Sequence, residues 1–213
     1  MLLAVSVPLL GGAGPTAADR VIRLVEDRYN PAKTLRVEFM EEYSIQGHRR
    51  PPESGVLTLQ KQGKMRWDYT HPAGKLFVSD GKMLYLYTAR DNRVEDIPLK
   101  DTEDMRAPLA FLLGHLDLKK EFRDFQVQTK DGGTRLTAMA KSDRLPYKSI
   151  EMLAKPDGSI AELRVVGQDG SLLKYEFSNE TANVRVSEAL FHFVIPPGAE
   201  VVKAVEYGMQ GKQ

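Results

Sequence analysis

The spacing of apolar residues changes near Pro31. Before it, Val21, Leu24 and Val25 recur at helical spacing after a possible Asp19 cap, and the pattern ends at Asn30-Pro31. After it, apolar and polar residues alternate one by one, as in half-buried strands. This alternation involves Leu35, Val37 and Phe39, then Met65, Trp67 and Tyr69, then Met83, Tyr85 and Tyr87. The chain is therefore predicted to form one N-terminal helix followed by β-strands.

Turn signals separate these strand patterns. Asp-Gly pairs, which favour the positive φ angles of tight hairpin turns, occur at residues 80–81, 131–132, 157–158 and 169–170. Gln62-Gly63 stands in a similar place between two strand patterns. The spacing predicts about ten or eleven strands in an antiparallel, all-β sheet or barrel.

An apolar segment interrupts the strand pattern in the middle of the chain. Residues 100–105 are polar and acidic, and residues 107–114 are almost entirely apolar, with Pro108 near the start and Gly114 at the end. Proline at the start and glycine at the end are typical of a short helix. Two interpretations stay open, a plug over one end of the sheet and a lid over a cavity, and they are compatible.

The first residues have the pattern of a secretory signal. Leu2 to Leu10 is an apolar run too short to span a membrane, and small residues follow it, although a basic start is missing. Cleavage is expected after Ala18, or alternatively after Ala13. We therefore predict a signal peptide at residues 1–18, a single domain at residues 19–213, and a soluble, exported protein.

Composition excludes several classes of function. The net charge of +1 argues against a nucleic-acid binder, which normally carries a strongly basic face. The hydrophobic share of 42% is enough for a folded core. The chain has no cysteine, so it has no disulfide, no thiolate nucleophile and no cysteine for lipid attachment.

No residue pattern indicates catalysis. The four histidines stand apart, without the short spacings of metal ligands, and the acidic residues near position 103 lack a glycine-punctuated calcium loop. A Gly-x-Ser-x-Gly motif is also absent. We expect no catalytic residues, no metal and no cofactor, with an enzyme built on other residues as an alternative.

Aromatic and methionine residues gather in two neighbouring predicted hairpins, around Trp67 and Tyr85. Such residues usually form ordinary core. A concave apolar face that is only partly filled would instead hold a lipid chain, and flexible methionines suit an irregular guest. The sequence leaves both possibilities open.

Several motifs, in order along the chain, resemble the LolA family of lipoprotein carriers. They are the tryptophan strand that leads to a proline (residues 61–72), Val-Ser-Asp-Gly (78–81), the aromatic strand (84–87), the apolar helix (108–113) and Phe-His-Phe-Val-Ile-Pro-Pro-Gly (191–198). Val37-Glu38-Phe39 stands where the family has its first strand. The resemblance covers nearly all of the predicted mature chain.

The resemblance implies an incomplete, half-open antiparallel β-barrel with a short helical lid and an N-terminal helix. It implies a soluble periplasmic carrier that shields lipoprotein acyl chains, receives its cargo from an inner-membrane ABC transporter and delivers it to an outer-membrane acceptor. We expect the ligand to contact Val37, Phe39, Met65, Trp67, Tyr69, Met83 and Tyr85, with Leu109, Phe111, Leu112 and Leu113 closing the cavity.

Two positions depart from the family pattern. Lys61-Gln62 stands where the family often has Arg-Pro, whose arginine is thought to hold the lid through backbone carbonyls, so we expect Lys61 to act as the lid gate. Glu41 stands near a usual glutamine. The alternatives to a lipoprotein carrier are a related β-sheet carrier or sensor for another amphiphile, and a structural interaction module.

Overall fold

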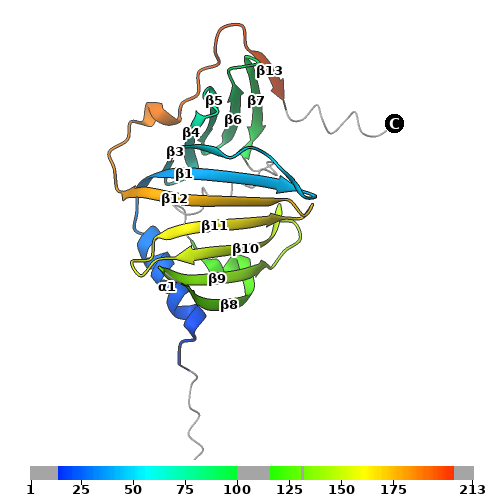
Figure 1. Ribbon diagram of the computed structural model, residues 1–213. Helices are drawn as coiled ribbons and strands as arrows, with labels where there is room; N and C mark the ends of the chain where they lie inside the picture. Colours follow the sequence, from blue (N-terminus) through cyan, green and yellow to red (C-terminus); the bar gives the residue numbers. More distant parts are fainter. Residues whose placement is uncertain (1–13, 100–115, 131, 204–213) are drawn as a thin grey trace, which may run out of the picture.

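One large β-sheet dominates the computed structural model, which describes residues 14–99, 116–130 and 132–203 (Figure 1). The central strand β1 (Thr34–Ile45) joins two meanders. The first comprises β3 (Glu53–Gln60), β4 (Lys64–His71), β5 (Lys75–Asp80), β6 (Met83–Thr88) and β7 (Arg93–Pro98). The second comprises β8 (Phe122–Lys130), β9 (Gly133–Ala140), β10 (Tyr147–Ala154), β11 (Ile160–Gly167) and β12 (Leu172–Ala182). Antiparallel pairing of β1 with β3 and with β12 unites them.

The sheet is open, with β8 at one edge and β13 (Glu200–Lys203) at the other in the described part of the chain. It has 13 strands, more than predicted, because β13 and β2 (His48–Arg49) are too short to show a sequence period. The predicted antiparallel sheet is confirmed with one correction, since β13 pairs with β7 in parallel.

The predicted N-terminal helix is α1 (Ala17–Tyr29), but its cap is Thr16 and not Asp19. Asp19 is the third helical residue, and the two residues form a capping box in which each side chain accepts a hydrogen bond from the other's backbone N–H. The buried side of α1 carries Val21, Ile22 and Val25 and packs near β8 and β9. The helix therefore covers part of one face of the sheet.

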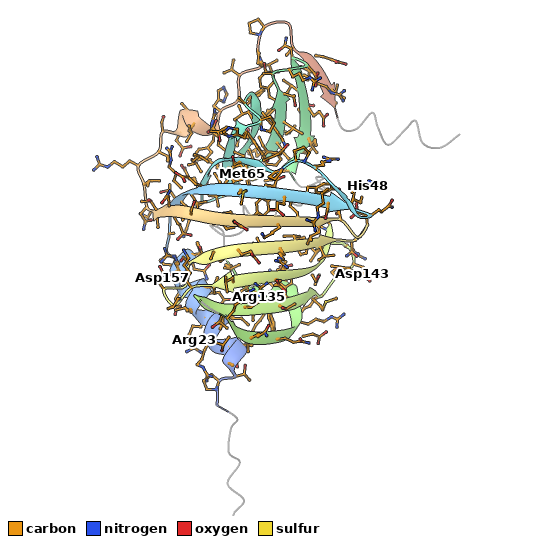
Figure 2. All side chains as sticks on the ribbon, in the orientation of Figure 1. Arg23, His48, Met65, Arg135, Asp143 and Asp157 are labelled. Atoms are coloured by element: carbon orange, nitrogen blue, oxygen red, sulfur yellow. The ribbon has the colours of Figure 1, made fainter. Side chains whose placement is uncertain are left out.

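A hydrogen-bond network fixes the end of α1 to the sheet. The Tyr29 hydroxyl donates to Glu180 at 2.7 Å and accepts from the Ile160 backbone N–H at 3.0 Å. Arg28 donates to Glu180 and contacts Asp157, which lies beside α1 in Figure 2. Burial, together with the Glu180 carboxylate, raises the pKa of Tyr29. This hydroxyl is therefore neutral at physiological pH.

The predicted Asp-Gly turns at residues 80–81, 157–158 and 169–170 connect successive strands. Gly158 shows why glycine is needed, because its φ is +83° and a Cβ there would lie 2.5 Å from the Leu24 carbonyl oxygen. The turn between β10 and β11 can thus approach the backbone of α1.

The two faces of the sheet are covered differently. The main core includes α1, the inner sides of the strands and Leu116 and Leu118, the latter in the short helix α2 (Leu118–Glu121). The C-terminal segment 184–203 follows the meander of β4 to β7: its 3-10 helix η3 (Glu188–Phe191) contacts β4 and β5, Phe193 packs on the outer face of β6, and its end forms β13 beside β7 (Figure 1). We call residues 184–203 the C-terminal strap.

Candidate functional site

An aromatic cluster lies on the inner face, where β1, β4 and β5 bring their apolar side chains together. The Trp67 ring packs edge-on against Phe39, with centroids 4.8 Å apart, and lies 6.4 Å from Phe77 and 5.4 Å from Tyr175. Phe39 also meets Tyr69 edge-on at 5.1 Å. We call these five residues the inner-face cluster.

Strand register explains why these residues meet. Val37, Leu57, Trp67, Phe77 and Leu86 are successive cross-strand partners on β1, β3, β4, β5 and β6. Side chains at such positions share one face of the sheet. In the next row Gly55 stands between Phe39 and Tyr69 and has no side chain, so the two rings can meet above it.

Five predicted ligand-binding residues lie in or next to this cluster. Val37 and Phe39 are each 3% exposed, Met65 and Trp67 0%, and Tyr69 5%. The prediction that Met65, Trp67 and Tyr69 share one face is confirmed. Leu109, Phe111, Leu112 and Leu113 lie outside the described residues.

Met83 and Tyr85 were placed on the wrong face. Leu84 and Leu86 of β6 belong to the inner core, so the residues that alternate with them point to the outer face. There the Tyr85 ring stacks on Phe193 of the C-terminal strap at 5.1 Å. A ligand on the inner face therefore cannot contact Met83 or Tyr85 directly.

The inner face also carries polar groups that the sequence did not single out as ligand contacts. Glu41 is only 5% exposed and accepts a hydrogen bond from the Tyr69 hydroxyl at 3.0 Å. Ser79 is fully buried, and its hydroxyl accepts from the Gly81 N–H at 3.1 Å. Strict alternation on β1 and the register of β5 could have identified both positions, since each shares a face with Trp67.

Lys61 contacts a helix end, as expected, but the helix is α1. Its ammonium group donates to the carbonyl of Asn30, the C-terminal cap of α1, at 3.0 Å. The Asn30 side chain in turn accepts from the Leu116 N–H at 2.7 Å and donates to the Leu116 carbonyl at 3.0 Å. Lys61 is thus linked through Asn30 to the residue that follows the undescribed segment 100–115.

A separate groove of about 580 Å³ lies on the outer face, across β1, β3, β11 and β12 among others. Met40, Val56 and Leu153 give it an apolar lining, and Glu38, Glu162 and Glu176 add carboxylates. Further along this face the Arg135 guanidinium pairs with Glu151 and Glu162 (Figure 2). Cross-strand ion pairs therefore accompany the groove, whereas aromatic packing dominates the inner face.

Comparison with known proteins identifies the family. Residues 30–194 match the family described as outer membrane lipoprotein carrier protein LolA. This chain belongs to that family. The outer-membrane lipoprotein carrier protein of Bordetella avium is 30% identical over 74% of this chain and 75% of its own length. The protein of the same name from Chromobacterium violaceum is 28% identical over 90% of this chain and 91% of its own length.

A solved structure has the same fold as this LolA-family chain. An uncharacterized conserved protein from Thermus thermophilus superposes with a TM-score of 0.53 at 14% identity, over 88% of this chain and 99% of its own. Within the described residues, none of the helices has the length and apolar character needed to cross a membrane.

Proposed function

We propose that this protein is a periplasmic carrier that shields the acyl chains of lipoproteins between the inner and outer membranes. Membership of the LolA family and the names of the relatives support this proposal. The inner-face cluster supports it most directly, because its aromatic rings, with the aliphatic side chains packed around them, form one apolar cluster on one side of an open sheet.

The physical requirement is strong. Each methylene group removed from water contributes about 0.8 kcal/mol, so acyl chains cross an aqueous compartment only when they are covered. In this structure α1 covers part of the inner face. We propose an inner-membrane ABC transporter as the donor, an outer-membrane lipoprotein acceptor as the recipient, and export by a cleaved signal peptide.

Neighbouring residues of β1 provide a matched test. Both residues are among those that line the outer groove, but the Phe39 ring is only 3% exposed and packs against Trp67 and Tyr69 on the inner face, whereas Met40 is 38% exposed. A photoreactive amino acid placed at position 39 should crosslink to a triacylated lipoprotein in a loading reaction, and the same group at position 40 should not. Analysis of the crosslinked product by mass spectrometry identifies the cargo.

The opposite result would be decisive. Crosslinking from position 40 alone would move the binding site to the outer groove. Crosslinking from position 39 to a free lipid, without peptide, would favour a carrier for another amphiphile.

A further inference from the structure

The side chain of Trp67 holds a buried hydrogen-bond donor that has no acceptor among the described residues. Trp67 is 0% exposed, and in the described part of the chain its Nε1 has no hydrogen-bond partner. Buried donors without an acceptor are rare, because they lose their bond to water without replacement. The lack of an acceptor for this buried N–H therefore calls for a physical explanation.

Local packing prevents the ring from finding an acceptor by itself. Phe39 packs edge-on against the indole, and Phe77 and Tyr175 lie near its other sides. Turning the ring toward a backbone carbonyl would break these contacts. The N–H is thus fixed in direction by its aromatic neighbours.

Two other polar side chains of this face have hydrogen-bond partners within the protein. The Tyr69 hydroxyl donates to Glu41, and the Ser79 hydroxyl accepts from the Gly81 N–H. Trp67 differs from them, because its cross-strand neighbours on this face, Leu57 and Phe77, are both apolar. An acceptor from outside the protein fits this arrangement.

We propose that the Trp67 indole N–H donates a hydrogen bond to the ester or amide carbonyl that links an acyl chain to the rest of the cargo. The acceptor must be neutral, since an anion placed among these buried apolar side chains would lose its hydration without a compensating charge. In an acylated molecule the neutral acceptors next to the chain are these carbonyls. The inference rests on the proposed function and adds a specificity-determining residue to it.

The chain has one tryptophan, so the wild-type protein contains its own reporter. In a protein labelled with ¹⁵N, the indole gives a single N–H signal. Two probes differ only in the carbonyl group, 1-monodecanoylglycerol (an ester) and 1-O-decylglycerol (an ether). We expect the ester to move the indole proton downfield and to bind about 2- to 10-fold more tightly than the ether.

The outcomes separate the inference from the proposed function. Binding of both probes with equal affinity and no downfield movement overturns the role of Trp67 but leaves an acyl-chain carrier. Failure of both probes to bind contradicts the proposed function, and the inference with it. Decanoate, an anion of similar chain length, should bind more weakly than the ester, and tighter binding of decanoate would also overturn the inference.

Two variants complete the test. Trp67→Phe keeps an aromatic ring but removes the donor, so its affinities for ester and ether should become equal. Phe77→Leu, the control on the neighbouring strand, should weaken both probes by the same factor and keep the preference for the ester. A Trp67→Phe protein that still prefers the ester by the wild-type ratio would refute the proposal.

Discussion

The link from Lys61 through Asn30 to Leu116 allows a direct test of the prediction that Lys61 acts as a gate. The Lys61 ammonium lies 3.0 Å from the Asn30 carbonyl, at the end of α1 where backbone carbonyls concentrate negative partial charge. Lys61→Leu removes this donor and its charge, and Lys61→Arg retains both. The two variants therefore test the same contact, one by removing it and the other by keeping it.

The magnitude follows from the environment of the bond. A hydrogen bond that involves a charged group contributes about 1.5 to 3 kcal/mol when it is well buried. Lys61 is only partly buried, so solvent screening lowers the expected value to about 1 kcal/mol. That energy changes an equilibrium constant about five-fold. We expect Lys61→Leu to lower the free energy of unfolding by about 1 kcal/mol and to speed cargo release up to about five-fold.

Urea denaturation and transfer of a lipoprotein to its acceptor measure the two effects separately. Lys61→Arg should unfold and release cargo like the wild type, or release it more slowly. Lys82→Leu, which removes an exposed lysine at a turn, is the control for loss of a charge. If Lys61→Leu matches this control in both stability and transfer rate, Lys61 is a solvated lysine and has no gating role.

Three further predictions concern the ends of the chain and of α1. Thr16→Ala should lower the free energy of unfolding of the exported protein by about 1 kcal/mol, because Thr16 caps α1. Since this cap belongs to the folded protein, we expect the signal peptide to be cleaved after Ala13, which makes Gly14 the first residue, and intact mass would check this. Tyr29→Phe should lower the free energy of unfolding by about 1 to 3 kcal/mol through the lost bond to Glu180. Since the pKa of Tyr29 is raised on folding, the advantage of the wild type should be complete below about pH 10 and shrink above it in urea titrations. Phe193→Ala should destabilise by about 1 to 2 kcal/mol, as a half-buried ring is lost, and leave crosslinking from position 39 unchanged.

The sequence pattern predicted the inner face of β4 well. On this strand the residues that alternate with Met65, Trp67 and Tyr69 are charged or polar, so only one side can face the core. The same reasoning located Val37 and Phe39 on β1. On both strands one side is mainly apolar and the other is mainly polar or charged, so the alternation of residues shows which side faces the core.

On β6 the same reasoning failed because both sides of the strand are apolar. Leu84 and Leu86 alternate with Tyr85 and Tyr87, and nothing in the strand itself tells which pair faces inward. The pairing of Ser79 with Leu84 places the leucines on the inner side. The tyrosines are apolar on the other side because a segment about a hundred residues later in the chain covers them, which is a long-range fact that no local pattern contains.

The cover on the outer face has a consequence for how a carrier can stay folded while its cargo changes. Val78, Val94 and Phe191 are each at most 2% exposed, yet they lie outside the main core cluster. Together with the stacked rings of Tyr85 and Phe193 they form a second small core between the β4 to β7 meander and the C-terminal strap. This meander is therefore stabilised from its outer side, independently of what occupies its inner side. If cargo binds the inner-face cluster as proposed, Trp67 and Phe77 can exchange one set of apolar neighbours for another while the strands that carry them keep their register.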